Sequence, residues 1–216
     1  MEKVISKIKE KINEFFVGED TGHDISHLER VYKYAIKIQE AEGGDLYVIS
    51  VSALVHDIHR ILSNKYGRFV PAEESLDDVK NLLLKCDIDL EKLDAILNVV
   101  KYHDNKEVKD LPIEALIIQD ADALDAVGEV GLERTLKYCK KHNIPVWDNR
   151  FELDYKDYVP NTNPISTCHY IYRTMIPNGK NLYTETAKIL ANEKMQVLYD
   201  FIKANTGINI ENKKTF

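Results

Sequence analysis

The chain has 216 residues, of which 44% are hydrophobic and 30% are charged. This composition is typical of a globular protein with a sizeable core, and it excludes a largely disordered chain. The formal net charge of −7 argues against a partner held by broad electrostatic attraction, so we expect no binding to nucleic acid. A local basic pocket for a small anionic substrate is compatible with this charge.

Residues 1–11 carry no continuous apolar core, so we expect no signal peptide. The sequence contains no run of about 18 apolar residues, so we predict no membrane span. The three cysteines, Cys86, Cys139 and Cys168, lie far apart and form no Cys-x-x-Cys pair, so a zinc–thiolate cluster is not expected. We predict a cytoplasmic protein with no membrane partner, either a monomer or a homodimer.

Apolar side chains recur at helical spacing along most of the chain, and strand-like alternation is sustained nowhere. Asp45 suits an N-cap, and Pro112 suits the first turn of a helix. We predict helices over residues 2–17, from Leu28 to about Gly43, from Asp45 through the His56-Asp57 doublet, from Pro71 to Leu83, from Leu90 to His103, and from Pro112 through Asp122 towards Tyr138. The pattern indicates an all-α fold.

The pattern weakens over residues 142–183, which contain four of the six prolines and the only tryptophan. We interpret this stretch as a long irregular segment or lid that can include short helices. Thr184 then suits the cap of a last helix over residues 184–205. The chain is predicted to form one domain over residues 1–216, with its core at about 1–140 and a variable segment at 142–183.

Two histidines and two aspartates stand on otherwise apolar helical patterns. His27 lies four residues before Val31, on the inward stripe of its predicted helix. His56 and Asp57 are about 100° apart on a helix, so both can reach one ion only near the helix end. Asp122 follows Ala121 on a helix that reads as buried, where an unpaired carboxylate is costly. One divalent metal ion would satisfy all four groups.

Each residue also has an ordinary explanation. His27 can be a core histidine, a His-Asp dipeptide is common by chance, and Asp122 can belong to an acidic cluster at a helix start. These explanations are weaker together than singly, because three separate helices would each have to carry an unexplained polar residue at a core-facing position.

The same residues resemble the H…HD…D pattern of the HD-domain metal-dependent phosphohydrolase superfamily. The resemblance is closer to small bacterial and archaeal HD hydrolases, and it covers about residues 1–140. Three segments carry it: Gly-His-Asp-x-x-His-x-x-Arg-Val at 22–31, Leu-Leu-His-Asp-Ile at 54–58 with Val55 in place of the second leucine, and Asp-Ala-Asp-x-Leu-Asp-Ala-x-Gly-x-x-Gly-x-x-Arg at 120–134.

The resemblance implies an HD-domain helical bundle of about six to nine helices. It implies one divalent metal ion, Mn, Mg, Fe, Co or Ni, held by His27, His56, Asp57 and Asp122. Imidazole and carboxylate ligands suit Mn²⁺ or Fe²⁺ better than a thiolate-seeking metal, and we favour Mn²⁺. We therefore expect a metal-dependent phosphohydrolase that acts on a phosphoester or phosphoanhydride of a small molecule. A nucleotide is the preferred substrate, cleaved in the manner of a (d)NTP pyrophosphohydrolase or a nucleotidase.

Three alternatives stay open. The same scaffold can carry a phosphodiesterase or a dinucleoside polyphosphate hydrolase, or it can serve as a non-catalytic nucleotide or metal sensor. HD-domain oxygenases need additional histidines for a second iron, and His23 and His103 make that reading conceivable.

Further residues are candidates for helpers at the site. Alongside Asp57, His103 is a candidate for phosphate contact or general acid, and Glu74 for a general base, although Glu74 also fits the acidic first turn of a helix. Five basic or histidine side chains are candidates for substrate binding: Arg60, Lys65, Arg68, Arg134 and His169.

Overall fold

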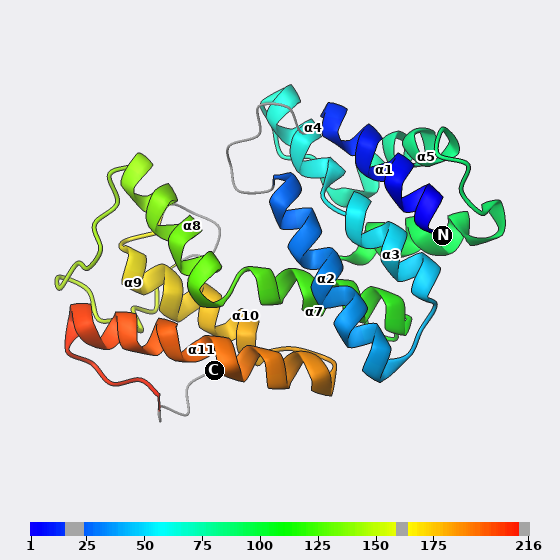
Figure 1. Cartoon of the computed structure of the whole chain (residues 1–216). Helices are drawn as coiled ribbons and strands as arrows, with labels where there is room; N and C mark the ends of the chain where they lie inside the picture. The colour runs from blue at the N-terminus through cyan, green and yellow to red at the C-terminus, as the bar shows by residue number, and fades with distance from the viewer. Residues whose placement is uncertain (16–23, 159–163, 212–216) are drawn as a thin grey trace. The chain divides into compact units, whose positions relative to one another are not determined.

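The computed structural model describes residues 1–15, 24–158 and 164–211, and all regular structure within these ranges is helical (Figure 1). The all-α fold class predicted from the sequence is confirmed. The chain divides into two compact units, residues 1–122 and residues 123–216. The expectation of a single domain stays a prediction, because this division describes compactness and not independent folding. No helix in the described ranges is long and apolar enough to span a membrane.

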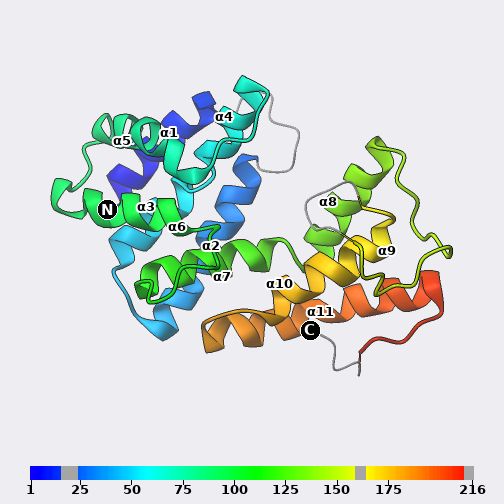
Figure 2. The same cartoon turned by 180° about the vertical axis from the view of Figure 1, so that it is seen from behind.

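The first unit is built around α3 (Leu46–Val55), whose residues from Val48 to Val55 are all buried. A helix that is apolar all round belongs inside a core, and α3 packs against three others (Figures 1 and 2). These neighbours are α1 (Glu2–Phe15), α2 (Ile25–Glu42) and α6 (Leu93–Tyr102). The remaining elements of this unit are α4 (Ile58–Tyr66), the 3₁₀ turn Ala72–Ser75, α5 (Leu76–Leu84), the 3₁₀ turn Leu90–Lys92 and most of α7 (Ile113–Asp125).

Two aspartate caps decide where helices of the first unit begin. The Asp24 side chain accepts a hydrogen bond from the backbone N–H of His27, which starts α2 and places His27 in its first turn. The Asp45 carboxylate accepts from the backbone N–H groups of Tyr47 and Val48, so the predicted cap of α3 is confirmed. Capping side chains of this kind satisfy N–H groups that the first helical turn leaves without partners.

The boundaries around the His-Asp doublet differ from the prediction. The helix that was expected to run through the doublet ends at Val55, and α4 begins at Ile58. His56 and Asp57 therefore occupy the junction between two helices. A fully buried helix shows no amphipathic period, so the sequence pattern could not reveal the break.

The helix predicted from Pro112 towards Tyr138 is also two helices, α7 and α8 (Gly128–Lys141). The chain turns at Val127, which has extended backbone angles, and Gly128 has a φ of 81°. Glycine adopts this left-handed conformation without the steric cost that a side chain would add. The break lies between the last turn of α7 and α8, which is the first helix that belongs wholly to the second unit.

The second unit contains α8, α9 (Thr167–Tyr170), a π-helical turn over Ile171–Met175, α10 (Ile176–Lys180) and α11 (Glu185–Thr206). Its buried side chains include Val127, Leu153, Tyr172, Met175 and Leu198. Thr184 accepts from the backbone N–H of Ala187, so the predicted cap of the last helix is confirmed.

Residues 142–183 were predicted to form an irregular segment that can include short helices, and the structure is helical from Thr167 to Lys180. Ser166 caps this stretch by accepting from the backbone N–H of His169. Pro177 lies in the first turn of α10, where a helix tolerates the missing N–H. In the described part of this segment, residues 142–158 and 164–166 contain no helix.

Candidate metal centre

Four buried histidines gather in the first unit. His27 comes from α2, His56 from the junction before α4, His59 from α4, and His103 from the end of α6. Each is at most 2% exposed. The ring centroids of His27 and His56 are 5.4 Å apart, those of His56 and His103 are 5.0 Å apart, and those of His103 and His59 are 5.1 Å apart. The rings thus form a continuous row, and Asp57 lies beside it.

The four predicted metal ligands come together in this row. His27 Nε2 lies 3.1 Å from Asp57 Oδ2 and 3.4 Å from Asp122 Oδ1, and His56 Nε2 lies 3.6 Å from Asp57 Oδ2. One ligand atom each from His27, His56 and Asp57 lies within 4.8 Å of the others. Three of the ligands are buried, whereas the Asp122 side chain is 34% exposed. Asp122 is thus the most exposed of the four side chains.

Backbone carbonyl groups fix the orientation of three of the rings. The Nδ1 atoms of His56, His59 and His103 lie 3.0, 3.2 and 2.7 Å from the carbonyl oxygens of Ala53, His56 and Val100. Because a carbonyl only accepts, each Nδ1 must donate its hydrogen there, which leaves Nε2 to face the site. In the described part of the chain these three Nε2 atoms are buried and make no hydrogen bond. Metal-binding histidines commonly show this arrangement.

Burial and charge set the protonation of these rings. Burial lowers the pKa of His56 to about 4, and it lowers the pKa of His59 to about 4, in both cases against the attraction of Asp57. Both rings are therefore neutral at pH 7. Burial also acts to lower the pKa of His103, but the Asp57 carboxylate near its Nε2, together with Asp104, outweighs burial and raises it. The neutral imidazoles and the carboxylates make a donor set that fits a divalent ion such as Mn²⁺ or Fe²⁺.

Two residues at this site had no role in the sequence-based prediction. His59 follows the doublet by two positions on α4, and its Nε2 lies 3.7 Å from Asp104 Oδ2. Gln119 of α7 is 3% exposed, and its Nε2 donates to the carbonyl oxygens of Tyr102 and Asn105 at 2.7 and 3.2 Å. Gln119 thereby fixes the turn that carries His103. In the sequence, the only sign of either residue was a polar side chain at a helical position expected to be buried. Such a sign is weak unless a second residue of the same site is also recognised.

Arg60 is the substrate-binding candidate that the structure brings to the metal ligands. Its Nε lies 3.7 Å from Asp57 Oδ1, and its Nη2 lies 3.9 Å from Asp104 Oδ2. The side chain is 35% exposed. It can therefore reach both the buried carboxylate and an entering anion.

Other candidates make their described contacts elsewhere. Arg68 Nη2 donates to Glu74 Oε2 at 2.7 Å, so the predicted general base forms a surface ion pair with a predicted substrate ligand. The Lys65 ammonium lies 5.7 Å from the centre of the Tyr66 ring. The proposed roles of Glu74, Lys65 and Arg68 stay predictions.

The two candidates in the second unit are engaged within that unit. Arg134 Nη1 donates to the buried Asp125 Oδ2 at 2.8 Å. His169 Nδ1 lies 2.7 Å from Ser166 Oγ, its Nε2 lies 3.0 Å from the Glu152 carbonyl oxygen, and its ring stacks on Trp147. These contacts account for both side chains structurally, and their substrate-binding roles stay predictions. His23 lies outside the described residues.

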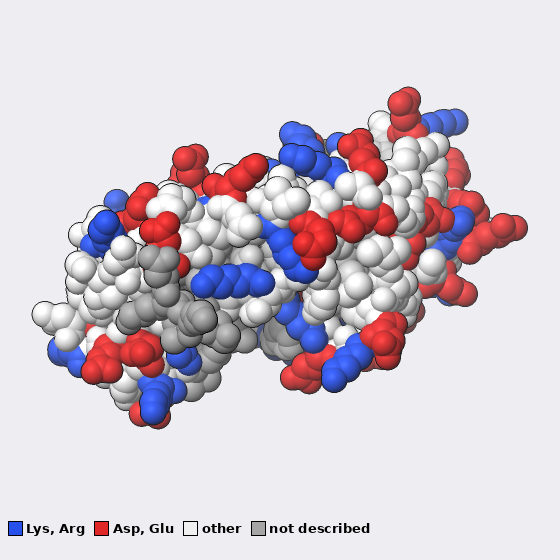
Figure 3. Space-filling model, turned by 90° about the horizontal axis from the view of Figure 1, so that it is seen from below, with Lys and Arg blue, Asp and Glu red and all other residues white. Residues whose placement is uncertain are grey.

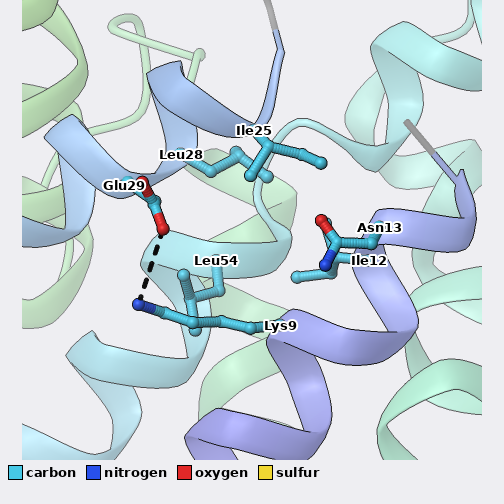
Figure 4. Close-up of a pocket in the computed structure, with 7 residues that line it drawn as sticks. All are labelled: Lys9, Ile12, Asn13, Ile25, Leu28, Glu29 and Leu54. Carbon is cyan, nitrogen blue, oxygen red and sulfur yellow. Dashed lines mark ion pairs between the residues drawn. The ribbon is translucent and has the colours of Figure 1, made fainter. Parts of the chain in front are cut away.

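A small pocket lies apart from the histidine row, between α1, α2 and α3 (Figure 4). Its volume is about 50 Å³, which suffices for a few water molecules only. Lys9 and Glu29 face each other across it at 3.9 Å. It is lined by Lys9, Ile12, Asn13, Ile25, Leu28, Glu29 and Leu54. We assign it no catalytic role, because none of the predicted metal ligands lines it.

The all-helical fold and the buried His/Asp cluster together are the features of a metal-binding hydrolase. The HD domain family matches residues 24–127, a range that includes all four predicted ligands. The chain belongs to the HD-domain superfamily and is a hydrolase of that superfamily. The relationship predicted from the sequence is confirmed.

Similar proteins span nearly the whole chain. The Lin1889 protein from Listeria innocua is 30% identical, with 99% of this chain and 98% of that chain covered and a TM-score of 0.69. An HD-superfamily hydrolase from Bacillus thuringiensis is 25% identical, with 94% and 93% covered and a TM-score of 0.67. YpgQ of Bacillus subtilis, whose structure was solved in complex with ADP, is 25% identical, with 94% and 93% covered and a TM-score of 0.72.

Proposed function

We propose that this protein is a divalent-metal-dependent phosphohydrolase that cleaves a phosphoester or phosphoanhydride of a nucleotide. One observation carries the proposal: two imidazoles and two carboxylates converge, and the only partly exposed member, Asp122, gives access from solvent. The ADP bound to YpgQ supports a nucleotide as the ligand. Manganese is our preferred ion, since the donors are imidazole and carboxylate without thiolate.

His27, His56, Asp57 and Asp122 would hold the ion. A divalent ion at this position would polarise a phosphoryl oxygen and lower the pKa of a bound water. Arg60 is placed to bind a phosphate oxygen, because its guanidinium lies beside Asp57 and is partly exposed. Burial acts to lower the pKa of His103, but the neighbouring Asp57 carboxylate raises it, and His103 is our candidate for the group that donates a proton to the leaving oxygen.

The charge distribution agrees with a small anionic substrate. Acidic and basic side chains are interspersed on the face shown in Figure 3, and its described part shows no broad basic area. A nucleotide would therefore be bound through local contacts such as Arg60 and the metal ion, and not through a charged surface.

The test is hydrolysis of a panel of nucleoside mono-, di- and triphosphates by chelator-stripped protein, with and without Mn²⁺. We expect activity only with metal, and Asp57→Ala should lower it by roughly 100-fold or more, because even outer-shell changes at metal sites cost about 10–100-fold. Asp94→Ala is the matched control, since Asp94 is an exposed aspartate at the start of α6. Full activity of Asp57→Ala would refute the mechanism.

Product identity separates the alternatives on the same scaffold. Release of pyrophosphate indicates a triphosphate pyrophosphohydrolase, and release of inorganic phosphate indicates a nucleotidase. With a dinucleoside polyphosphate added to the panel, release of two nucleotides indicates a dinucleoside polyphosphate hydrolase. Binding of nucleotide and Mn²⁺ in calorimetry without turnover would instead identify a sensor.

A further inference from the structure

Residues 144–153 form a loop that is attached to the start of α9 within the second unit. The carbonyl oxygens of Pro145 and Val146 accept hydrogen bonds from the backbone N–H groups of Thr167 and Cys168, at 2.9 and 3.0 Å. Loop carbonyl groups thus satisfy N–H groups that the first turn of a helix leaves without partners. Release of this loop would expose those N–H groups to water.

One side chain of α9, the fully buried His169, holds the same loop at two further points. Its ring stacks on Trp147, with the ring centroids 4.9 Å apart and the planes inclined by 18°. Its Nε2 lies 3.0 Å from the carbonyl oxygen of Glu152. We propose that His169 is a pH-sensitive latch, and that protonation of its ring releases residues 144–153 from α9.

The hydrogen bonds of His169 require a neutral ring. Because the Glu152 carbonyl group only accepts, Nε2 carries the hydrogen, and Nδ1 is then an acceptor. Ser166 Oγ lies 2.7 Å from Nδ1 and therefore donates its hydrogen to it. A proton on Nδ1 would occupy the position of that hydrogen, so the buried Ser166 hydroxyl would lose its acceptor. A buried polar group without its partner is costly.

The charged groups around the ring do not compensate for this cost. Burial lowers the pKa of His169 against the attraction of Asp148, which faces the ring from the loop. The hydrogen bond from Arg150 lowers the pKa of Asp148 to about 2, so this carboxylate stays charged at every pH of interest. Helices α8 and α11 also pack against α9, but none of their described ionisable side chains acts on the ring.

The direction of the pH effect follows from the two states of the loop. When the loop is released, the ring loses Trp147 and the Glu152 carbonyl group, and its pKa returns towards the ordinary value of 6.5. Below pH 6.5 the released form therefore takes up a proton that the attached form resists. The released fraction should rise by up to about tenfold per pH unit as the pH falls below this value. This inference does not depend on the proposed metal or substrate.

The experiment follows the loop in the full chain between pH 7.5 and pH 5.5. Trp147 is the only tryptophan, so its fluorescence reports on the loop alone. Hydrogen exchange measured by NMR gives the protection of the Thr167 and Cys168 amides relative to an unstructured peptide at the same pH. As the pH falls, we expect the emission to shift to longer wavelength and the protection of both amides to fall by up to about tenfold. The amide of Leu198 in α11 should keep its protection.

Two histidine variants assign the effect. His169→Gln removes the titrating ring, so both signals should become independent of pH in this range. His142→Gln alters an exposed histidine of the same unit and should behave as the wild-type protein does.

Other outcomes overturn the inference. Protection that is independent of pH in the wild-type protein, or that falls equally at Leu198, would show that no local release occurs. An unchanged pH dependence in His169→Gln would show that another group is responsible. If His169→Gln does not fold, the ¹⁵N shifts of the wild-type His169 ring decide the matter. An Nε2–H tautomer that titrates below pH 6.5 supports the latch, and an Nδ1–H tautomer or a titration at or above 6.5 overturns it.

Discussion

The backbone position of Asp57 places its carboxylate at the centre of the candidate site. It stands at the N-terminus of α4 directly after the last turn of α3, so its carboxylate is buried among rings that come from three other segments. A buried carboxylate is costly unless it is paired, and here its neighbours are imidazoles and Arg60. These neighbouring side chains therefore stabilise the buried Asp57 carboxylate, which in turn holds the centre of the site.

The four proposed metal ligands could be singled out because each is a polar residue on an apolar pattern and together they match a known motif. His59 and Gln119 could not be predicted in the same way. A single buried polar residue produces no periodic signal, and what it contacts depends on segments far away in the sequence. For Gln119 these are the carbonyl groups at the end of α6.

Gln119 should stabilise the turn that carries His103. Gln119→Ala removes the donor to two carbonyl groups, those of Tyr102 and Asn105, in part-buried hydrogen bonds, so we expect a loss of about 1–3 kcal/mol in the free energy of unfolding, measured in urea. Gln196→Ala removes an exposed glutamine of α11 and should change stability by less than about 0.5 kcal/mol. Equal effects of the two variants would contradict the role of Gln119.

The three cysteines should be unreactive in the folded protein. Cys86, Cys139 and Cys168 are at most 2% exposed, and burial raises the pKa of Cys168 to about 12. Because the thiolate is the nucleophile, a disulfide reagent at pH 8 should modify native protein slowly. It should modify all three thiols in denaturant, as measured by absorbance. Rapid modification of one thiol without denaturant would show that its surroundings open readily.

Among the secondary-structure elements, it is the ends of helices that hold the histidine and aspartate side chains of the candidate site. His27 lies in the first turn of α2, His56 and Asp57 lie between α3 and α4, and His103 lies at the end of α6. The amphipathic helices and their caps were predictable from periodicity and residue type. The break at the doublet was not, because α3, which precedes it, is buried and has no polar face.

The cap of α2 should matter for metal binding. Asp24→Ala removes the side chain that accepts from the His27 backbone N–H, so we expect a loss of about 1 kcal/mol in stability. We also expect weaker Mn²⁺ binding, because the first turn that holds His27 loosens. Calorimetric titration with Mn²⁺ and urea unfolding measure the two effects.

Asp24→Asn separates capping from charge in the same experiment. Asparagine caps helices about as well as aspartate, so this variant should retain most of the stability and metal affinity. If Asp24→Asn lost as much Mn²⁺ affinity as Asp24→Ala, the carboxylate charge and not the cap would be responsible.

The boundary between the two compact units of the whole molecule falls inside a helix. Helix α7 runs from Ile113 to Asp125, and the units divide between residues 122 and 123. No proline- or glycine-rich linker marks this point, so composition gave no sign of a division. The proposed metal ligand Asp122 is the last residue of the first unit, and Asp125, the partner of Arg134, lies one turn further in the second.

We expect the two units to unfold together, because a continuous helix belongs to both. Mn²⁺ at about 100 times its dissociation constant should then raise the free energy of unfolding by about 2.7 kcal/mol. In native-state hydrogen exchange, the slowest amides of α3 and of α11 should gain the same protection, although the ligands lie only in the first unit. A gain confined to α3 would show that residues 123–216 unfold independently, and it would contradict the single domain expected from the sequence.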